Sequence, residues 1–246
     1  MNYTELFTKG AEGCSYSLFY HVWPWMGLGA AIVMLILIFG TNFLRSNLNK
    51  PRMKDPSILA WLGFVVYLFH NFEEFGLDLY GHQLGFAYIV NGIIGVQTTE
   101  GLSLGCNLPL IWVATPLAAY FVQKGNTKMA SAMTCFSLLN STGHIVQGLA
   151  FGMYNPGILN AALMSWPLGV WTIYVCSRYE NQSKKVFFRH FLAAVAYHIV
   201  LISSGAGLIT GVLNEFWQTF LTIADAFLIF YIWTTTEKKV DIFQIE

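Results

Sequence analysis

Residues 58–74 read ILAWLGFVVYLFHNFEE, an apolar run that ends in one histidine and two adjacent glutamates. The run is typical of a helix inside a lipid bilayer, where an ionisable side chain costs roughly 2.5–3.5 kcal/mol and is usually functional. On such a helix, positions i, i+3 and i+4 share one face. We therefore expect His70, Glu73 and Glu74 to converge on one point, where an imidazole and carboxylates suit a divalent metal ion.

The composition of the chain is that of a polytopic membrane protein. Of its 246 residues, 55% are hydrophobic and only 11% are charged, whereas a soluble domain has about 25% charged residues. The mean hydropathy is +0.53, and the apolar residues form runs too long for a soluble core. The formal net charge is zero, which gives no basis for nucleic-acid binding. The sequence predicts a single all-α domain, residues 1–246, in a lipid bilayer.

We predict a bundle of about seven transmembrane helices, separated by short polar or basic loops. The predicted spans are 23–44, 57–80, 101–122, 129–153, 158–176, 191–210 and 216–234. Prolines inside the third and fifth spans predict kinks, because proline has no N–H to donate. A further apolar stretch at 86–94 predicts a short helix that is unlikely by its length to cross the bilayer.

The basic residues predict the orientation of the bundle. Apart from Lys9, every Lys and Arg lies in one of four segments, 45–56, 123–128, 178–189 and 235–246. Seven spans put these segments on one side of the membrane, and basic loops face the cytoplasm. We therefore expect the N-terminus outside and the C-terminus in the cytoplasm. We also expect the first span to remain uncleaved, and a bacterial inner membrane suits this pattern.

A second polar stripe lies on the predicted span 129–153. Asn140 and His144 are four residues apart and share one helix face. At about 1.5 Å of rise per residue, His70 and His144 lie roughly 18 Å and 22 Å from the cytoplasmic ends of their helices. Because the two stripes have similar depth, we expect them to face each other. His144 is therefore a predicted metal ligand.

Two later spans carry further candidate ligands. His198 lies in the sixth span, and Asp225 is the only charged residue within the seventh. Asp225 would bind the metal directly or accept a hydrogen bond from a ligand histidine. His198 lies lower than the other two histidines, and a hydrogen-bonded core residue is an equally good interpretation of it.

The motifs together resemble a known family. His70-x-x-Glu73-Glu74, Asn140-x-x-x-His144 and Tyr154-Asn155-Pro156-Gly157 follow one another inside or beside predicted membrane helices. This pattern is similar to the HXXEE-domain family, which consists of predicted integral membrane proteins of mainly bacterial origin. The resemblance spans about residues 60–200. It implies that His70, Glu73, Glu74 and His144 act together, and it supplies no reaction.

These features favour a metal-dependent membrane enzyme, a hydrolase acting on a lipid or lipid-like substrate from the bilayer. His70, His144 and one glutamate, Glu74, would hold a divalent ion, with zinc preferred and iron as the alternative. The other glutamate would be the general base on a water molecule. Asn140 or Gln147 would polarise the carbonyl or phosphoryl group of the substrate.

Two other functions fit the same residues. Intramembrane carboxylates and histidines also form proton relays, so a proton- or metal-coupled transporter or binding protein is one alternative. The sequence lacks the internal repeat that is common in transporters. A non-haem iron membrane oxidase is the other alternative, although the sequence has no second Glu-x-x-His element.

Overall fold

The structure is a computed structural model that describes residues 2–235, and these residues form helices and loops without any strand. The predicted all-α class is thus confirmed. In chain order the elements are α1 (Tyr3–Ala11), α2 (Leu18–Gly40), η1 (Arg52–Lys54), α3 (Pro56–Asn71), η2 (Phe72–Gly76), α4 (Gly85–Ile94), α5 (Glu100–Asn107), η3 (Leu108–Ala114), α6 (Thr115–Gln123), α7 (Lys128–Phe151), α8 (Ile158–Asn160), η4 (Ala161–Ser165), α9 (Trp166–Tyr179), α10 (Lys184–Ile209) and α11 (Glu215–Thr235).

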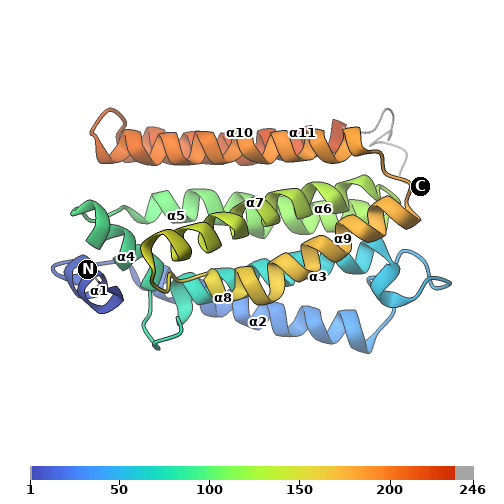
Figure 1. Cartoon of the computed structure of the whole chain (residues 1–246), viewed down its shortest axis with the longest axis horizontal. Helices are drawn as coiled ribbons and strands as arrows, with labels where there is room; N and C mark the ends of the chain where they lie inside the picture. The colour runs from blue at the N-terminus through green and yellow to red at the C-terminus, as the bar shows by residue number, and fades with distance from the viewer. Residues whose placement is uncertain (1, 236–246) are drawn as a thin grey trace.

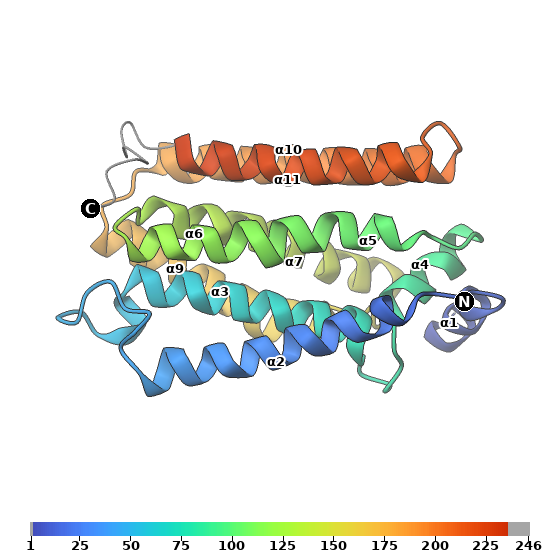
Figure 2. The ribbon, with the colours of Figure 1, turned by 180° about the vertical axis from the view of Figure 1, so that it is seen from behind.

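The long helices lie in three layers, seen from opposite sides in Figure 1 and Figure 2. One outer layer is the pair α10 and α11. The middle layer holds α7 and the rod formed by α5, η3 and α6, and the other outer layer holds α2, α3 and α9. Helix α3 packs against α7, so the two polar stripes belong to neighbouring helices. The short helices α1 and α4 pack together at one end of the bundle.

Among residues 2–235, five helical segments are long and apolar enough to cross a membrane. They are Leu18–Gly40, Glu100–Gln123, Ile158–Tyr179, Lys184–Ile209 and Glu215–Thr235, and each matches a predicted span. The other two predicted spans, 57–80 and 129–153, contain α3 with η2 and α7. Helix α3 has only 16 residues, and α7 carries several polar side chains along its length. The number of seven spans and the orientation of the termini therefore stay predictions.

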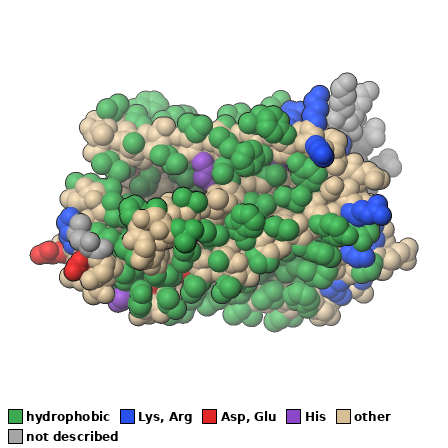
Figure 3. Space-filling view, viewed as in Figure 1, with side chains coloured by type: hydrophobic (Ala, Val, Ile, Leu, Met, Phe, Trp, Pro, Cys, Tyr) green, Lys and Arg blue, Asp and Glu red, His purple; other side chains and the backbone are tan. Residues whose placement is uncertain are grey.

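The distribution of side chains on the surface agrees with a membrane environment. Figure 3 shows hydrophobic side chains over the flank of the bundle, with Lys and Arg gathered at one end and acidic side chains at the other. The acidic end is the one that carries α1 and α4. An apolar belt between two charged ends is the arrangement that a bilayer requires.

The first long helix begins and ends earlier than predicted. Helix α2 begins at Leu18 because the Ser17 hydroxyl accepts a hydrogen bond from the Tyr20 N–H, at 3.2 Å, and caps the helix. It ends at Gly40, where the Arg52 guanidinium donates to carbonyls at the helix C-terminus, including that of Thr41 at 2.7 Å. A cation at this end is also favoured by the helix dipole.

Prolines produce widened turns within continuous rods instead of breaks. The π-helical element η3 contains Pro109 near its start and ends just before Pro116, and η4 ends just before Pro167. A residue without an N–H cannot complete the α-helical ladder, and a local π turn accommodates the missing bond. The third π turn, η2, contains no proline. It coincides with the two glutamates of the motif.

Candidate metal centre

His70, Glu74 and His144 meet in the interior, where α3, which continues into η2, packs beside α7. All three residues are buried, and one ligand atom from each lies within 4.8 Å of the others. The Oε1 atom of Glu74 is 3.5 Å from His70 Nε2 and 3.3 Å from His144 Nε2. A tetrahedral ion with bonds of about 2.0–2.1 Å holds its ligand atoms about 3.3–3.5 Å apart. The three side chains therefore fit a divalent metal ion.

Asn155 fixes the tautomer of His144. The Asn155 Nδ2 atom donates to the His144 carbonyl at 2.9 Å, so the Oδ1 atom of the same amide faces His144 Nδ1, also at 2.9 Å. Because this oxygen can only accept, Nδ1 carries a proton, and the neutral imidazole has its lone pair on Nε2. Ligand histidines in metal sites are oriented in the same way by a partner on their other nitrogen.

Asn140 has the corresponding effect on His70. Its Nδ2 atom lies 3.2 Å from His70 Nε2. An amide nitrogen can only donate, so His70 Nε2 carries a lone pair here. The rings of His70 and His144 meet edge to face, with their centroids 4.7 Å apart. Two imidazole lone pairs and one carboxylate oxygen are thus directed into the same small region.

The π turn separates the two glutamates that the sequence predicts to converge. In η2 the Leu77 N–H donates to the Phe72 carbonyl, five residues back, at 2.9 Å. This wider turn leaves Glu74, at i+4, next to His70 and rotates Glu73, at i+3, away from that face. The structure therefore brings only Glu74 to the histidines.

Glu73 instead accepts hydrogen bonds from the segment that follows α7. Its Oε1 atom accepts from the Tyr154 hydroxyl and the Leu159 N–H, both at 3.0 Å, and its Oε2 atom accepts from the Asn160 N–H at 2.7 Å. The two N–H groups belong to the first turn of α8, where a carboxylate satisfies free donors and interacts favourably with the helix dipole. Burial and the nearby Glu73 carboxylate raise the pKa of Tyr154 well above its usual range, which keeps this hydroxyl protonated as a donor.

The turn Tyr154–Gly157, which we name the YNPG turn, closes the cluster on one side. Gly157 has a φ of +100°, a conformation that favours glycine. A Cβ atom at this position would lie 2.7 Å from Cε1 of His70 and 2.8 Å from Cε1 of His144. The absence of a side chain at Gly157 therefore lets the backbone pack directly against both imidazole rings.

The other two predicted ligands lie outside this cluster, as far as residues 2–235 are concerned. His198 Nδ1 lies 2.8 Å from the carbonyl of Ala194 in its own helix, and its ring packs against that of Phe136 with centroids 5.0 Å apart. Asp225 is buried in α11, and its Oδ2 atom has no hydrogen-bond partner among the described residues. The structure does not bring either side chain to His70 and His144.

Sequence reasoning missed the residues that support the cluster. Asn155, Gly157 and Asn160 were not predicted as site residues, although the first two lie in the turn that carries the family resemblance. The turn composition was the available signal. Its contact with His70 and His144 depends on how α7 and α8 pack, which no local pattern reveals.

Within residues 2–235, the fold is an all-helical bundle with five helices long and apolar enough to cross a membrane, and it holds a buried cluster of two histidines and one glutamate. Residues 61–172 match a family model described as a protein of unknown function with HXXEE motif, which confirms the resemblance seen in the sequence. The matched region contains the three clustered side chains and the YNPG turn, and it ends before α10. No curated protein and no solved structure matches the chain.

Proposed function

We propose that the chain is a metal-dependent membrane enzyme that hydrolyses a lipid or lipid-like substrate. The observation that carries this proposal is the cluster of His70, Glu74 and His144 inside an apolar bundle. Three protein ligands leave the fourth position of a tetrahedral ion open, as in catalytic zinc sites. A divalent ion held there supplies Lewis acidity and lowers the pKa of water to about 7. We further propose a bacterial inner membrane as its location.

The surroundings of the two glutamates divide their roles. Glu73 already accepts three hydrogen bonds, so we propose it as a positioning residue and not as the general base. Glu74 faces both imidazoles with Oε1, and its second carboxylate oxygen is available to accept a proton from water. The water oxygen adds to the carbonyl carbon or phosphorus of the substrate, and the leaving group departs with a proton.

Asn140 is the residue best placed to orient the substrate. Its amide nitrogen donates toward His70 Nε2, the atom whose lone pair an ion would occupy. Once that lone pair is used, the Asn140 N–H is free to donate to a carbonyl or phosphoryl oxygen. Such a donor stabilises the negative charge that develops on this oxygen in the transition state.

The surroundings of the cluster support a substrate that arrives from the bilayer. Figure 3 shows a hollow between the α10–α11 layer and the middle layer, with a histidine side chain at its edge and hydrophobic side chains around it. A lipid could approach between these layers with its chains still in the apolar belt. Lateral access of this kind needs no transfer of the substrate through water.

The ligand set also supports a second candidate function. Two histidines and one carboxylate are the ligands that non-haem Fe(II) oxygenases use. The same cluster would therefore suit oxidation of a lipid if it binds iron. The bound metal distinguishes the two candidates.

Elemental analysis of the detergent-purified protein tests the proposal. We expect about one divalent metal ion per chain in the wild type and loss of that ion in His144→Ala. His198→Ala is the matched control, because it removes a histidine that lies outside the cluster, and it should retain the metal. Zinc supports hydrolysis, and iron supports oxidation. A metal-free wild type, or full metal content in His144→Ala, contradicts the proposal and favours a proton relay or transporter.

A further inference from the structure

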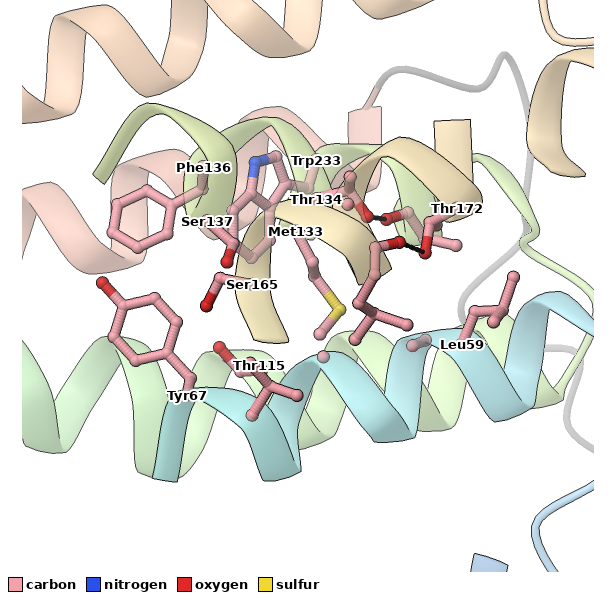
Figure 4. A pocket seen from close by; sticks show the side chains of 16 residues that line it. Leu59, Tyr67, Thr115, Met133, Thr134, Phe136, Ser137, Ser165, Thr172 and Trp233 are labelled. Carbon is pink, nitrogen blue, oxygen red and sulfur yellow. Dashed lines mark hydrogen bonds between the residues drawn. The ribbon is translucent and has the colours of Figure 1, made fainter. Parts of the chain in front are cut away.

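A small cavity lies beside the metal cluster, between helices α3, α6, α7, α9 and α11, and its volume is about 20 Å³. Its lining residues on α3 lie 3–11 residues before His70, and those on α7 lie 7–14 residues before His144. Figure 4 shows the side chains around it. Although the bundle is apolar, five serine and threonine side chains line this cavity: Thr115, Thr134, Ser137, Ser165 and Thr172.

These hydroxyl groups have unused hydrogen-bonding capacity. The three threonines donate to backbone carbonyls of their own helical rods, at 2.8–2.9 Å, and Ser165 donates to Asn160 Oδ1 at 2.8 Å. All four oxygens still have lone pairs. Ser137 and the buried Tyr67, which also lines the cavity, form no hydrogen bond through their hydroxyls with any residue of the described range 2–235. The cavity therefore offers both acceptors and donors.

The size and polarity of the cavity select one kind of ligand. A buried water molecule needs a cavity volume of roughly 10–15 Å³ and 2–4 polar partners. Cavities that stay empty of water are normally lined by apolar groups. A volume of about 20 Å³ is too small for an acyl chain or a lipid headgroup. In Figure 4 the hydroxyl groups of Thr115, Ser137 and Ser165 point toward one another, which allows one molecule to reach more than one of them.

We propose that this cavity is a binding site for one ordered water molecule. The site also deepens the proposed function, because it would hold a water molecule next to the cluster. This role rests on the proposed function being hydrolysis. The Tyr67 ring lies against the His70 ring, with centroids 5.2 Å apart. Ser165 donates a hydrogen bond to the Asn160 side chain, and the Asn160 N–H donates to Glu73. The cavity thus adjoins the cluster through Tyr67 and is linked to Glu73 through Asn160, and it places water within an apolar bundle.

A glycine in the cavity wall provides a test that keeps the protein folded. Gly63 lines the cavity, and a Cβ atom there would meet only the Met133 Cε atom, at 3.8 Å, an ordinary contact. Gly63→Ala therefore fills the space without a clash. Gly29→Ala is the matched control, because Gly29 lies inside α2 with nothing within 4 Å of such a Cβ. Both changes add the same helix propensity.

We expect an ordered water in the cavity in experimental structures of the wild type and of Gly29→Ala, and none in Gly63→Ala. Because the displaced water leaves hydroxyl groups without a partner, the Tm of Gly63→Ala should lie about 2–4 °C below that of Gly29→Ala. A dry wild-type cavity overturns the proposal. A Tm of Gly63→Ala equal to or above that of Gly29→Ala also overturns it, since filling a dry cavity stabilises.

The metal content of the same variants separates this proposal from the proposed function. Both alanine variants should hold as much metal as the wild type, because neither glycine contacts the ligands. Metal-free protein with an ordered water would remove the enzyme proposal and leave the water site in place. Metal-loaded protein with a dry cavity would support the enzyme proposal and overturn the water site.

Discussion

At the scale of single residues, the adjacent glutamates of the motif illustrate how backbone geometry assigns different roles to identical side chains. Glu74 is enclosed by two imidazoles, whereas Glu73 caps the first turn of α8. The two carboxylates leave adjacent positions of the π turn in different directions and so have different partners. The motif therefore combines one candidate ligand and one residue that anchors the YNPG turn.

Glu73→Gln is expected to retain the metal and to lose stability. The single glutamine oxygen can accept from Tyr154 and Leu159, but the new amide NH₂ then faces the N–H of Asn160. An unpaired buried donor costs about 1–3 kcal/mol, and each kcal/mol lowers the Tm of a protein of this size by about 2–4 °C. Thermal unfolding and metal content should be measured together, with Glu74→Gln as the variant expected to lose the ion. Equal loss of metal in both variants would place Glu73 in the ligand set.

The residue pattern identified the clustered side chains but not the division between the glutamates. The spacing of His70 and Glu74 and the matching depth of His144 follow from the rise of a helix. The π turn at Phe72–Gly76 contains no proline that would have predicted it. Helical spacing alone therefore predicted that Glu73 and Glu74 both reach the site. Asn155 was missed because its bond to His144 depends on the fold of the YNPG turn.

At the scale of elements, the YNPG turn connects α7 to the rod of α8, η4 and α9 and packs on the cluster. Glu73 holds the start of α8, and the Asn160 side chain donates to the Val66 carbonyl of α3 at 3.0 Å. These bonds fix the turn to α3, and the bond from Asn155 to the His144 carbonyl fixes it to α7. Its geometry and that of the metal cluster depend on each other.

Gly157→Ala should abolish metal binding, whereas Gly152→Ala should not. Both glycines have positive φ, +100° and +62°, so both substitutions add backbone strain of about 1–2 kcal/mol. Only the Gly157 Cβ atom would lie within 3.0 Å of the two imidazole rings; at Gly152 nothing lies within 4 Å. Metal content should be measured on folded, monodisperse protein. Because both variants add backbone strain, a loss of metal in Gly157→Ala alone is due to the contact with the imidazole rings. Retention of the metal by Gly157→Ala would contradict the close packing described above.

The sequence predicted the positions of the helices better than their internal geometry and exact boundaries. Apolar runs located the long helices, and prolines located irregularities in two of them. The sequence did not distinguish kinks from π turns, since the rods stay continuous when neighbouring helices pack along them. The observed boundaries of α2 differ from the predicted ones because a serine cap and a distant arginine, Arg52, define its ends.

At the scale of the whole molecule, an apolar flank separates two polar ends. The loop after α2 and the loop between α10 and α11 lie at opposite ends of the bundle in Figure 1. The first end carries most of the basic residues, which is the basis for the predicted orientation. The fold class and the apolar helices agree with the sequence prediction, and the orientation depends on a bilayer that only an experiment in cells can include.

Cysteine labelling tests that orientation. Leu48 and Val212 lie in the two opposite loops and are 64% and 80% exposed. In a chain whose Cys14 is replaced by serine, a membrane-impermeant maleimide should label Val212→Cys in intact cells and Leu48→Cys only after permeabilisation. The opposite pattern would reverse the orientation. Labelling of both cysteines in intact cells would mean that no membrane separates the two ends.

The position of the cluster along the chain has a consequence for biosynthesis. His70, Glu74, His144 and the YNPG turn are all translated before α10 and α11. In the predicted seven-span topology, the nascent chain carries three costly polar side chains into the bilayer while one outer layer of the bundle is still missing. Mutual pairing of these side chains, or early capture of an ion, lowers that insertion cost. Metal supply during translation, and not only afterwards, is thus expected to influence how much of the protein reaches the membrane intact.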